Sequence, residues 1–241
     1  MKYTEKYKTK WYETDASRRL RPSEIVVYMQ ETANLQFKSV GRNLDDERDI
    51  KGVGFILSKI SIDIIKPIFA YENIEVETFT SEGRAFAFNR CFRILRDGEL
   101  VAQAVSVWAL VNVNDGTLIK CDQTDLHFEH EEILTTAAPL RIRMPKGAEF
   151  ESCGKRKTLY SDIDYNMHMN NTKYPDMLCD FLPDPAHTRV VGVSLSYQKE
   201  AAYGDTLAVE RADVGDGVYY IRTRKGDVTC LEAMVKTEKV G

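Results

Sequence analysis

Residues 73–113 read "NIEVETFTSEGRAFAFNRCFRILRDGELVAQAVSVWALVNV" and decide what kind of fold this chain has. Aliphatic, aromatic and β-branched residues run through the whole stretch, and they are interrupted at Glu82-Gly83 and again at Asp97-Gly98. An acidic residue followed by glycine favours a hairpin turn, because glycine adopts positive φ without steric cost. The stretch therefore predicts consecutive antiparallel strands.

The C-terminal third of the chain repeats this plan. Residues 192–237 read "GVSLSYQKEAAYGDTLAVERADVGDGVYYIRTRKGDVTCLEAMVKT", with breaks at Asp216-Gly217 and Lys225-Gly226. A shared order of strands and turns indicates an internal repeat more strongly than any single matching residue.

Matching positions and helices support the duplication. Each copy begins with a polar turn followed by an expected helix, at about 23–38 in the first copy and about 171–181 in the second. Identical residues recur in the same order in the two copies, and the number of positions between matching residues falls from 149 to 128. The matching pairs are Asp15 and Asp164, Lys66 and Lys199, Gly83 and Gly217, and Gly98 and Gly226. We infer a duplicated α+β unit with shorter loops in the second copy.

Composition excludes several classes of protein. The 241 residues carry a net charge of −4 and a pI near 5.7, which argues against a nucleic-acid-binding surface over the whole protein. No apolar run approaches the roughly 20 residues of a membrane-spanning helix. The N-terminal residues lack a signal-peptide core, and the five cysteines form no CxxC pair, which favours reduced thiols. We expect a cytoplasmic protein.

The charge between the two copies is unevenly distributed. Residues 122–132 carry five acidic residues and no Lys or Arg, whereas residues 141–157 carry six basic residues against two acidic ones. One interpretation is a solvated linker, and the other is a docking patch for an acidic partner. The patch would consist of Arg141, Arg143, Lys155, Arg156 and Lys157.

Residues 161–174, "SDIDYNMHMNNTKY", hold an unusual density of short polar side chains. The spacing of Asp162, Asp164 and Asn166 matches the start of a calcium loop. The sixth position, which needs glycine, is Met167, and the twelfth, which needs glutamate, is Lys173. A single histidine without a paired ligand does not define a zinc site. We therefore expect neither a metal nor another cofactor.

Helix capping explains part of this density. Asn170 or Asn171 suits the N-cap of the following helix, since its side chain accepts an N–H bond that the first turn leaves open. Pro175 leaves the start of that helix undefined, because proline is tolerated only in the first turn. Capping accounts for one asparagine.

Three polar side chains at alternate positions need another explanation. In an extended segment, residues two apart project to the same side, so Asp164, Asn166 and His168 would present a carboxylate, an amide and an imidazole together. An imidazole with such partners exchanges protons near neutral pH. The adjacent helix start supplies N–H donors that polarise a carbonyl oxygen. This combination indicates hydrolysis of an acyl compound.

The same residues resemble the signature of the acyl-ACP thioesterases, double hot-dog enzymes that release fatty acids from acyl carrier protein. A second family landmark is a glutamate in a stretch similar to "LSYQKEAAYGD" (195–205), which is Glu200 here. Residues 12–41 are similar to the opening and central helix of the first hot dog. The family motif, approximately D-x-N-x-H-x-N-N-x-K-Y, is matched by Asp164, Asn166, His168, Asn170, Asn171, Lys173 and Tyr174.

The resemblance implies a tandem hot-dog fold of the α+β class, with two antiparallel sheets that each wrap one long central helix. Residues 1–122 would form the N-terminal hot dog with the acyl-chain pocket, residues 123–153 a linker, and residues 154–241 the catalytic hot dog. The implied activity is hydrolysis of fatty acyl-ACP to free fatty acid and ACP, which terminates fatty acid synthesis. The expected partner is acyl carrier protein. The expected oligomeric state is a monomer or a homodimer.

The implied catalytic residues share one site. Glu200, alone or with His168, would activate a water molecule that attacks the thioester carbonyl. Asp164 would orient this network and balance its charge, while Asn166 would position the water or a neighbouring side chain.

The two helices would supply the remaining contacts. Backbone N–H groups near Asn170 and Asn171 are expected to stabilise the oxyanion. Ile25, Met29 and Ala33 on the first helix are expected to face the acyl chain, although ordinary core positions would show the same pattern.

Two residues depart from the family pattern. Plant members have a cysteine after the glutamate, whereas this chain has Ala201, so that position supplies no thiolate. Cys153 and Cys179 are the remaining thiols that we considered as nucleophiles. Pro175 stands where other members have a different residue, and the missing transit peptide points to a bacterial-type member.

The first copy lacks the catalytic side chains. At the equivalent positions it carries Ser17 in place of Asn166 and Arg19 in place of His168, and Pro67 lies opposite Glu200. Three alternatives to an acyl-ACP thioesterase stay open: an acyl-CoA thioesterase, a hot-dog dehydratase acting on a 3-hydroxyacyl thioester, and a non-catalytic module that binds acyl groups or carrier protein.

Overall fold

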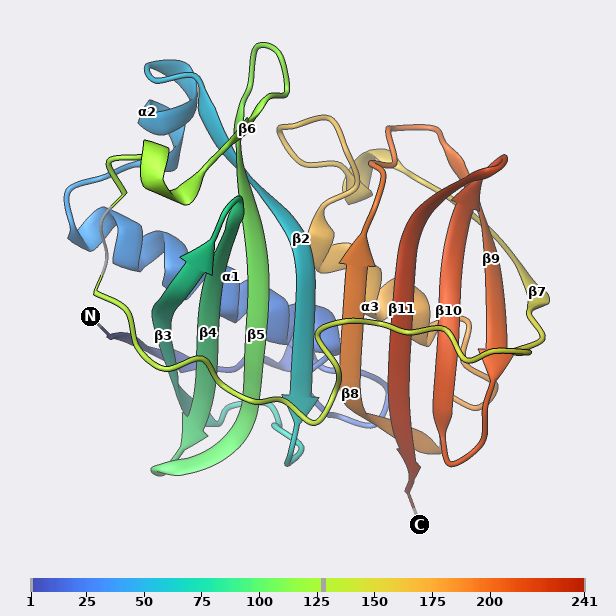
Figure 1. Cartoon of the computed structure of the whole chain (residues 1–241). Helices are drawn as coiled ribbons and strands as arrows, with labels where there is room; N and C mark the ends of the chain where they lie inside the picture. The colour runs from blue at the N-terminus through green and yellow to red at the C-terminus, as the bar shows by residue number, and fades with distance from the viewer. Residues whose placement is uncertain (1, 127–128, 241) are drawn as a thin grey trace.

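The computed structural model describes residues 2–126 and 129–240, and their strands form one antiparallel sheet (Figure 1). The first half contains β1 (Tyr3–Lys8), α1 (Pro22–Ser39), α2 (Leu44–Asp49), β2 (Val53–Ile64), β3 (Asn73–Arg84), β4 (Ala87–Arg96), β5 (Glu99–Asn112) and β6 (Leu118–Ile119). The second half contains β7 (Glu151–Lys157), α3 (Tyr174–Cys179), β8 (Thr188–Tyr197), β9 (Thr206–Asp213), β10 (Val218–Lys225) and β11 (Val228–Lys239). Four 3-10 turns complete it: η1 (Trp11–Glu13), η2 (Cys121–Gln123), η3 (Tyr160–Asp162) and η4 (Asn171–Lys173).

The two halves are joined by a strand pair at the centre of the sheet. The order is β1-β3-β4-β5-β2-β8-β11-β10-β9-β7, with β6 paired to β5. At the junction, Ile60 lies opposite Leu195 and Ile62 lies opposite Val193, and all four side chains are buried in one hydrophobic core. The expected two separate sheets are therefore one continuous sheet, because β2 and β8 hydrogen-bond edge to edge.

Three of the four sequence-predicted turns lie where they were expected. Asp97 and Gly98 both have positive φ, at 52° and 79°, and link β4 directly to β5 as a two-residue hairpin loop. The turns at Asp216-Gly217 and at Gly226 also connect consecutive strands. The Glu82-Gly83 prediction is wrong by three residues, because this pair forms a bulge within β3 and the chain reverses at Ala85-Phe86.

The helices differ in length between the halves. α1 has 18 residues and begins with Pro22 in its first turn, where the missing N–H group costs nothing. It matches the helix expected at 23–38. α3 has only six residues after η4, so a long central helix in the second half is wrong. Pro183 and Pro185 follow shortly after α3, and proline cannot continue a helix.

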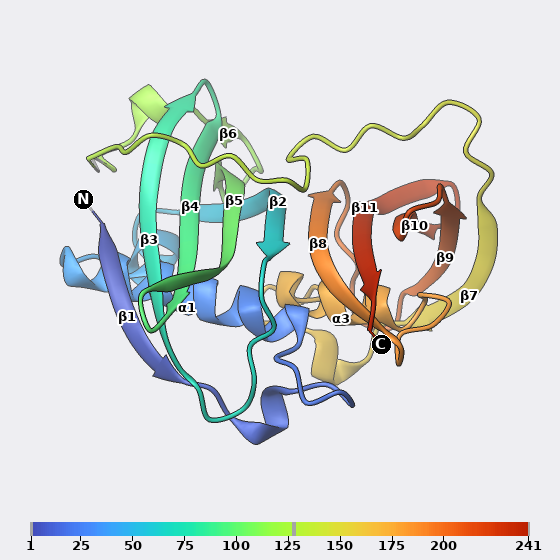
Figure 2. The same ribbon diagram turned by 90° about the horizontal axis from the view of Figure 1, so that it is seen from below.

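Three layers result from this arrangement (Figure 2). α1 and α3 lie against one face of the sheet, and the segment between the halves crosses the other face. Buried Asp63 anchors that segment by accepting the N–H groups of Ala137 and Ala138, at 2.8 and 2.9 Å. Leu134 and Leu140 pack over the outer face beside them. None of the helices among the described residues is long and apolar enough to cross a membrane.

Candidate active site

The polar stretch at the start of the second copy folds as a tight turn. The Asp164 N–H group donates to the His168 carbonyl at 3.0 Å, and Met167 has a φ of 65°. The Asp164 carboxylate accepts the N–H group of Asn166 at 2.9 Å, which is an Asx turn. The expected extended segment is therefore wrong, because the short Asp164 side chain closes a reversal over residues 164–168.

A second chain segment brings a carboxylate to the histidine. His168 pairs with Ala202 in an isolated antiparallel bridge, and the Met169 N–H group donates to the Ala201 carbonyl at 2.8 Å. This pairing places His168 Nε2 at 3.1 Å from Glu200 Oε2. The His168 side chain is 35% exposed and that of Glu200 57%, so water reaches both groups.

Asn166 is held by a residue from the first half of the chain. Arg48 on α2 donates a hydrogen bond from Nη1 to Asn166 Oδ1, and its guanidinium lies 5.3 Å from the ring centroid of Tyr165. The sequence offered no signal for Arg48, which stands within the acidic run "LDDERD" of α2. The site is therefore built from both halves.

The asparagine pair performs one of its two expected tasks. Asn170 is the N-cap of η4, since its side chain accepts the Thr172 N–H group at 2.9 Å, which confirms the capping prediction. The Asn170 N–H group itself donates to the Asp162 carbonyl at 2.8 Å. In residues 2–126 and 129–240, the structure gives no acceptor for the Asn171 N–H group. Of the two expected oxyanion donors, the Asn170 N–H group is therefore already used within the turn.

The equivalent turn of the first copy has the same backbone and different side chains. Asp15 donates its N–H group to the Arg19 carbonyl at 2.7 Å, and Arg18 has a φ of 64°, which reproduces the turn around Asp164. Arg19 pairs with Phe69 as His168 pairs with Ala202, so Pro67 occupies the place of Glu200. The predicted duplication is confirmed at these turns, and the first copy lacks the carboxylate and the imidazole.

Cys179, one of the two thiols considered as nucleophiles, is a weak nucleophile in this structure. Ala201 is fully buried next to Glu200 and supplies no thiol. Burial, with the charges of Asp176 and Asp180 nearby, raises the pKa of Cys179 to about 12. All five cysteines are free. No group of three or more His, Cys, Asp or Glu side chains in the described residues is arranged to hold a metal ion.

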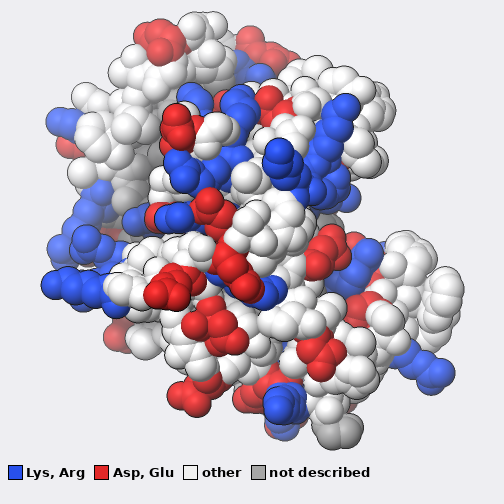
Figure 3. All heavy atoms as spheres, turned by 90° about the vertical axis from the view of Figure 1, so that its right-hand side faces the viewer, with Lys and Arg blue, Asp and Glu red and all other residues white. Residues whose placement is uncertain are grey.

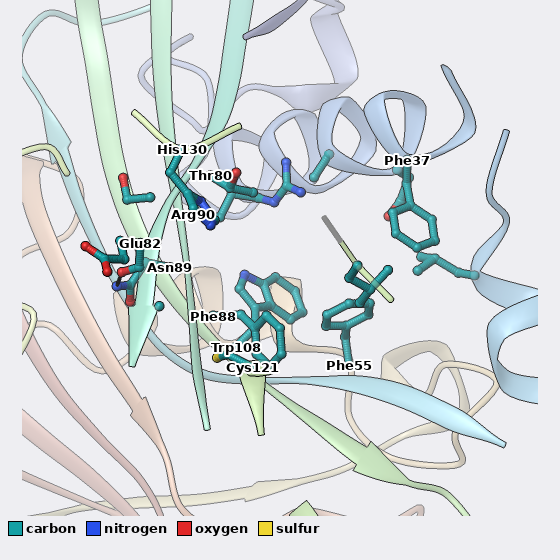
Figure 4. Close-up of a pocket in the computed structure, with 16 residues that line it drawn as sticks. Phe37, Phe55, Thr80, Glu82, Phe88, Asn89, Arg90, Trp108, Cys121 and His130 are labelled. Atoms are coloured by element: carbon teal, nitrogen blue, oxygen red, sulfur yellow. Dashed lines mark hydrogen bonds between the residues drawn. The ribbon is translucent and has the colours of Figure 1, made fainter. Parts of the chain in front are cut away.

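A cavity of about 190 Å³ lies in the first half of the chain (Figure 4). Leu44 on α2 lines this cavity, and Arg48, one helical turn later on the same helix, contacts Asn166. Ala33 on α1 also lines this cavity. Met29 is buried in the core, and Ile25 lines a second cavity of about 530 Å³ beside the turn of the first copy.

The basic segment is partly committed to the fold. The Arg156 guanidinium binds both carboxylate oxygens of buried Asp162 at 2.8 Å, so this arginine stabilises the segment that leads into the turn at Asp164. Lys155 and Lys157 are exposed on β7, the outermost strand of the second half. Arg141 and Arg143 are exposed in the crossing segment. Figure 3, which faces the β7 side, shows Lys and Arg side chains gathered over its upper part.

Comparisons with known proteins agree with this architecture. A crystal structure of an acyl-ACP thioesterase from Bacteroides thetaiotaomicron superimposes with a TM-score of 0.87 at 21% identity, covering 98% of both chains. The 12:0-ACP thioesterase from Umbellularia californica gives a TM-score of 0.79 at 17% identity, covering 99% of this chain and 97% of the other. At such identities the likeness establishes the fold, which is an α+β fold of the hot-dog type.

Family models cover both halves of the sequence. The acyl-ACP thioesterase N-terminal domain matches residues 1–123, and the acyl-ACP thioesterase C-terminal domain matches residues 148–236. The chain belongs to the acyl-ACP thioesterase family.

Curated relatives are longer than this chain. The chloroplastic palmitoyl-acyl carrier protein thioesterase of Arabidopsis thaliana is 24% identical over 95% of this chain and 59% of its own length. An oleoyl-acyl carrier protein thioesterase of the same plant is 25% identical over 86% of this chain and 62% of its own length. The chain thus spans roughly three fifths of these relatives.

Proposed function

We propose that this protein hydrolyses fatty acyl thioesters of acyl carrier protein to free fatty acid and carrier thiol. The observation that carries the proposal is the 3.1 Å contact between His168 Nε2 and Glu200 Oε2, which joins residues 32 positions apart in the sequence. The names of the curated relatives support acyl carrier protein as the carrier.

In the proposed reaction, the Glu200 carboxylate, together with His168, removes a proton from a water molecule. The water oxygen attacks the thioester carbonyl carbon, and the negative charge moves to the carbonyl oxygen. Collapse of this tetrahedral intermediate breaks the C–S bond, and the departing thiolate takes up the proton. The exposure of both side chains to solvent suits a mechanism in which water is the nucleophile.

The other site residues would hold this pair and the reacting atoms. The Asn171 N–H group is the proposed oxyanion donor, and Asn166 positions the water. Asp164 acts through the backbone, since its carboxylate closes the turn that carries Asn166 and His168.

The two halves would divide the work. The first half, residues 1–122, would supply the acyl-chain cavity, and residues 154–241 would supply His168 and Glu200, with residues 123–153 connecting them. A cytoplasmic location and a monomeric or homodimeric state stay predictions.

Thiol release from purified wild-type protein tests the proposal. Acyl-ACP and acyl-CoA of the same chain length are compared, and a clear preference for acyl-ACP is expected. His168→Ala should abolish most turnover, whereas His187→Ala should not, although His187 forms a similar pair with Asp184 at 2.8 Å on the surface. Equal loss in both variants, or a preference for acyl-CoA, would contradict the proposal.

A further inference from the structure

A charged side chain lies inside the cavity of the first half. Arg90 on β4 belongs to the same strand face as Phe92 and Ile94, which are both fully buried beneath the helices. Instead of an apolar side chain, this position carries a guanidinium that reaches α1. Figure 4 shows Arg90 among the residues that line the cavity.

The hydrogen bonds of Arg90 leave its charge without a counter-ion. Its Nη1 donates to the side chain of Gln36 and to Thr78 Oγ1 at 3.1 Å, and both acceptors are neutral. Across residues 2–126 and 129–240, no carboxylate forms an ion pair with Arg90, and these bonds use only one of its three nitrogens. Glu82, an acidic residue that lines the same cavity, is exposed to solvent. Burial lowers the pKa of Arg90 to about 10, so the group still carries its charge at neutral pH.

The cavity has an apolar side and a polar side (Figure 4). The rings of Phe37, Phe55, Phe88 and Trp108 gather on one side, and Phe55 makes edge-to-face contacts with both other phenylalanines. The indole N–H group of Trp108 is already used, since it donates to Ser106 Oγ at 2.8 Å. The polar side chains of Thr80, Glu82, Asn89, Arg90 and His130 lie across from the rings.

A plain hydrocarbon chain is a poor match for such a cavity. Its methylene groups would pack well against the rings, but they would also displace water from Arg90 and offer no acceptor in return. Covering an unpaired charged donor is costly, whereas an oxygen acceptor placed against it restores the lost hydrogen bond. A site of this kind selects a ligand that carries the acceptor.

We propose that the cavity takes acyl chains bearing a hydroxyl or oxo group, and that Arg90 is the residue that recognises this oxygen. The inference rests on the proposed thioester hydrolysis, because it names the class of acyl group that this reaction would release. The rings of the apolar side hold the hydrocarbon part of the same chain.

Substrate selectivity of the wild-type protein is the first test. kcat/KM is measured with plain acyl-ACP and with hydroxy- and oxoacyl-ACP isomers of equal chain length, substituted at successive carbons. We expect at least one oxygenated isomer to exceed the plain chain by roughly 10- to 150-fold, the range of a hydrogen bond to a charged group. If the plain chain is hydrolysed as well as or better than every isomer, the inference is overturned without any variant.

A matched pair of variants assigns the selectivity to Arg90. Arg90→Met should remove the preference while plain acyl-ACP is still hydrolysed. Arg93→Met is the control, since Arg93 lies three residues later on the opposite face of β4 and pairs with Glu77 at 2.9 Å. Loss of the preference in both variants, or its persistence in Arg90→Met, would contradict the assignment.

Ligand binding separates this inference from the proposed reaction. Trp108 lines the cavity, so in a Trp11→Phe background its fluorescence reports binding of free hydroxy and plain fatty acids without turnover. Tighter binding of a hydroxy acid together with no thioester hydrolysis would refute the proposed function and retain the inference. Hydrolysis with equal binding of both acids would retain the function and refute the inference. If Arg90→Met does not fold, the binding measurement in the Trp11→Phe protein, whose cavity is unchanged, tests the inference by itself.

Discussion

Replacing Arg48 with methionine tests whether the first half of the chain positions the turn that carries Asn166 and His168. Methionine keeps much of the length of the side chain and removes both the hydrogen bond to Asn166 and the stacking on Tyr165. A hydrogen bond from a charged donor contributes about 1.5–3 kcal/mol, and a cation–π contact at an exposed site adds about 0.5–1 kcal/mol. If Arg48 acts only by holding Asn166, the loss of the hydrogen bond lowers kcat by roughly 10- to 150-fold.

The assay for Arg48 separates positioning from folding and binding. Steady-state hydrolysis of acyl-ACP should show a lower kcat with little change in KM, since Arg48 contacts the turn and not the acyl chain. Combining Arg48→Met with Asn166→Ala should cost no more than Asn166→Ala alone, because both changes remove the same contact. Lys51→Met serves as the control, as Lys51 lies just after α2 and pairs with Glu47 and Asp125. Full activity of Arg48→Met, or additive losses in the double variant, would refute the reasoning.

Three further predictions concern the exposed basic residues, the half-buried thiol of Cys179 and the crossing segment. Charge reversal of the exposed basic residues should raise KM for acyl-ACP and leave KM for acyl-CoA unchanged; the residues to change are Arg141, Arg143, Lys155 and Lys157. Arg156 is kept because it binds Asp162, and an unchanged KM for acyl-ACP would leave this segment as a connector. Cys179 has a pKa raised to about 12 against an ordinary value of 9.0, so the native state keeps its proton while the unfolded chain loses it. The unfolding free energy should therefore fall between about pH 9 and 12 by up to about 1.4 kcal/mol per pH unit, and Cys179→Ala should lack this part of the slope in denaturant titrations. Asp63→Ala leaves the N–H groups of Ala137 and Ala138 without their acceptor, and we expect a loss of about 1–3 kcal/mol of stability and faster proteolysis of the crossing segment; equal protease resistance would show that Asp63 does not anchor it.

The sequence predicted the repeat because turn chemistry is local. Asp15 and Asp164 close the same turn in each copy through their own short side chains. An aspartate at the same place in each copy was therefore enough to identify both turns. The hairpin at Asp97-Gly98 was predictable for the same reason, since two positive φ values favour that pair. Such features depend on a few neighbouring residues.

Features that depend on long-range packing were not predictable. Nothing near β2 or β8 shows that these two strands pair with each other rather than ending separate sheets. Arg48 reaches Asn166 across 118 positions of sequence, and an arginine in an acidic helix has the same local pattern when it only faces solvent. Alternation of Asp164, Asn166 and His168 suggested an extended segment, but the Asx turn at Asp164 outweighed it.

Hydrolysis of acyl-ACP by Glu200→Gln most directly tests the central claim that Glu200 and His168 activate water. Glutamine keeps the size of the side chain and cannot accept a proton, so the change isolates the carboxylate in the 3.1 Å pair with His168. We predict a fall in kcat of about 10²- to 10⁴-fold, the usual contribution of a general base, with unchanged circular dichroism and thermal stability. Turnover near that of the wild-type protein would contradict the account.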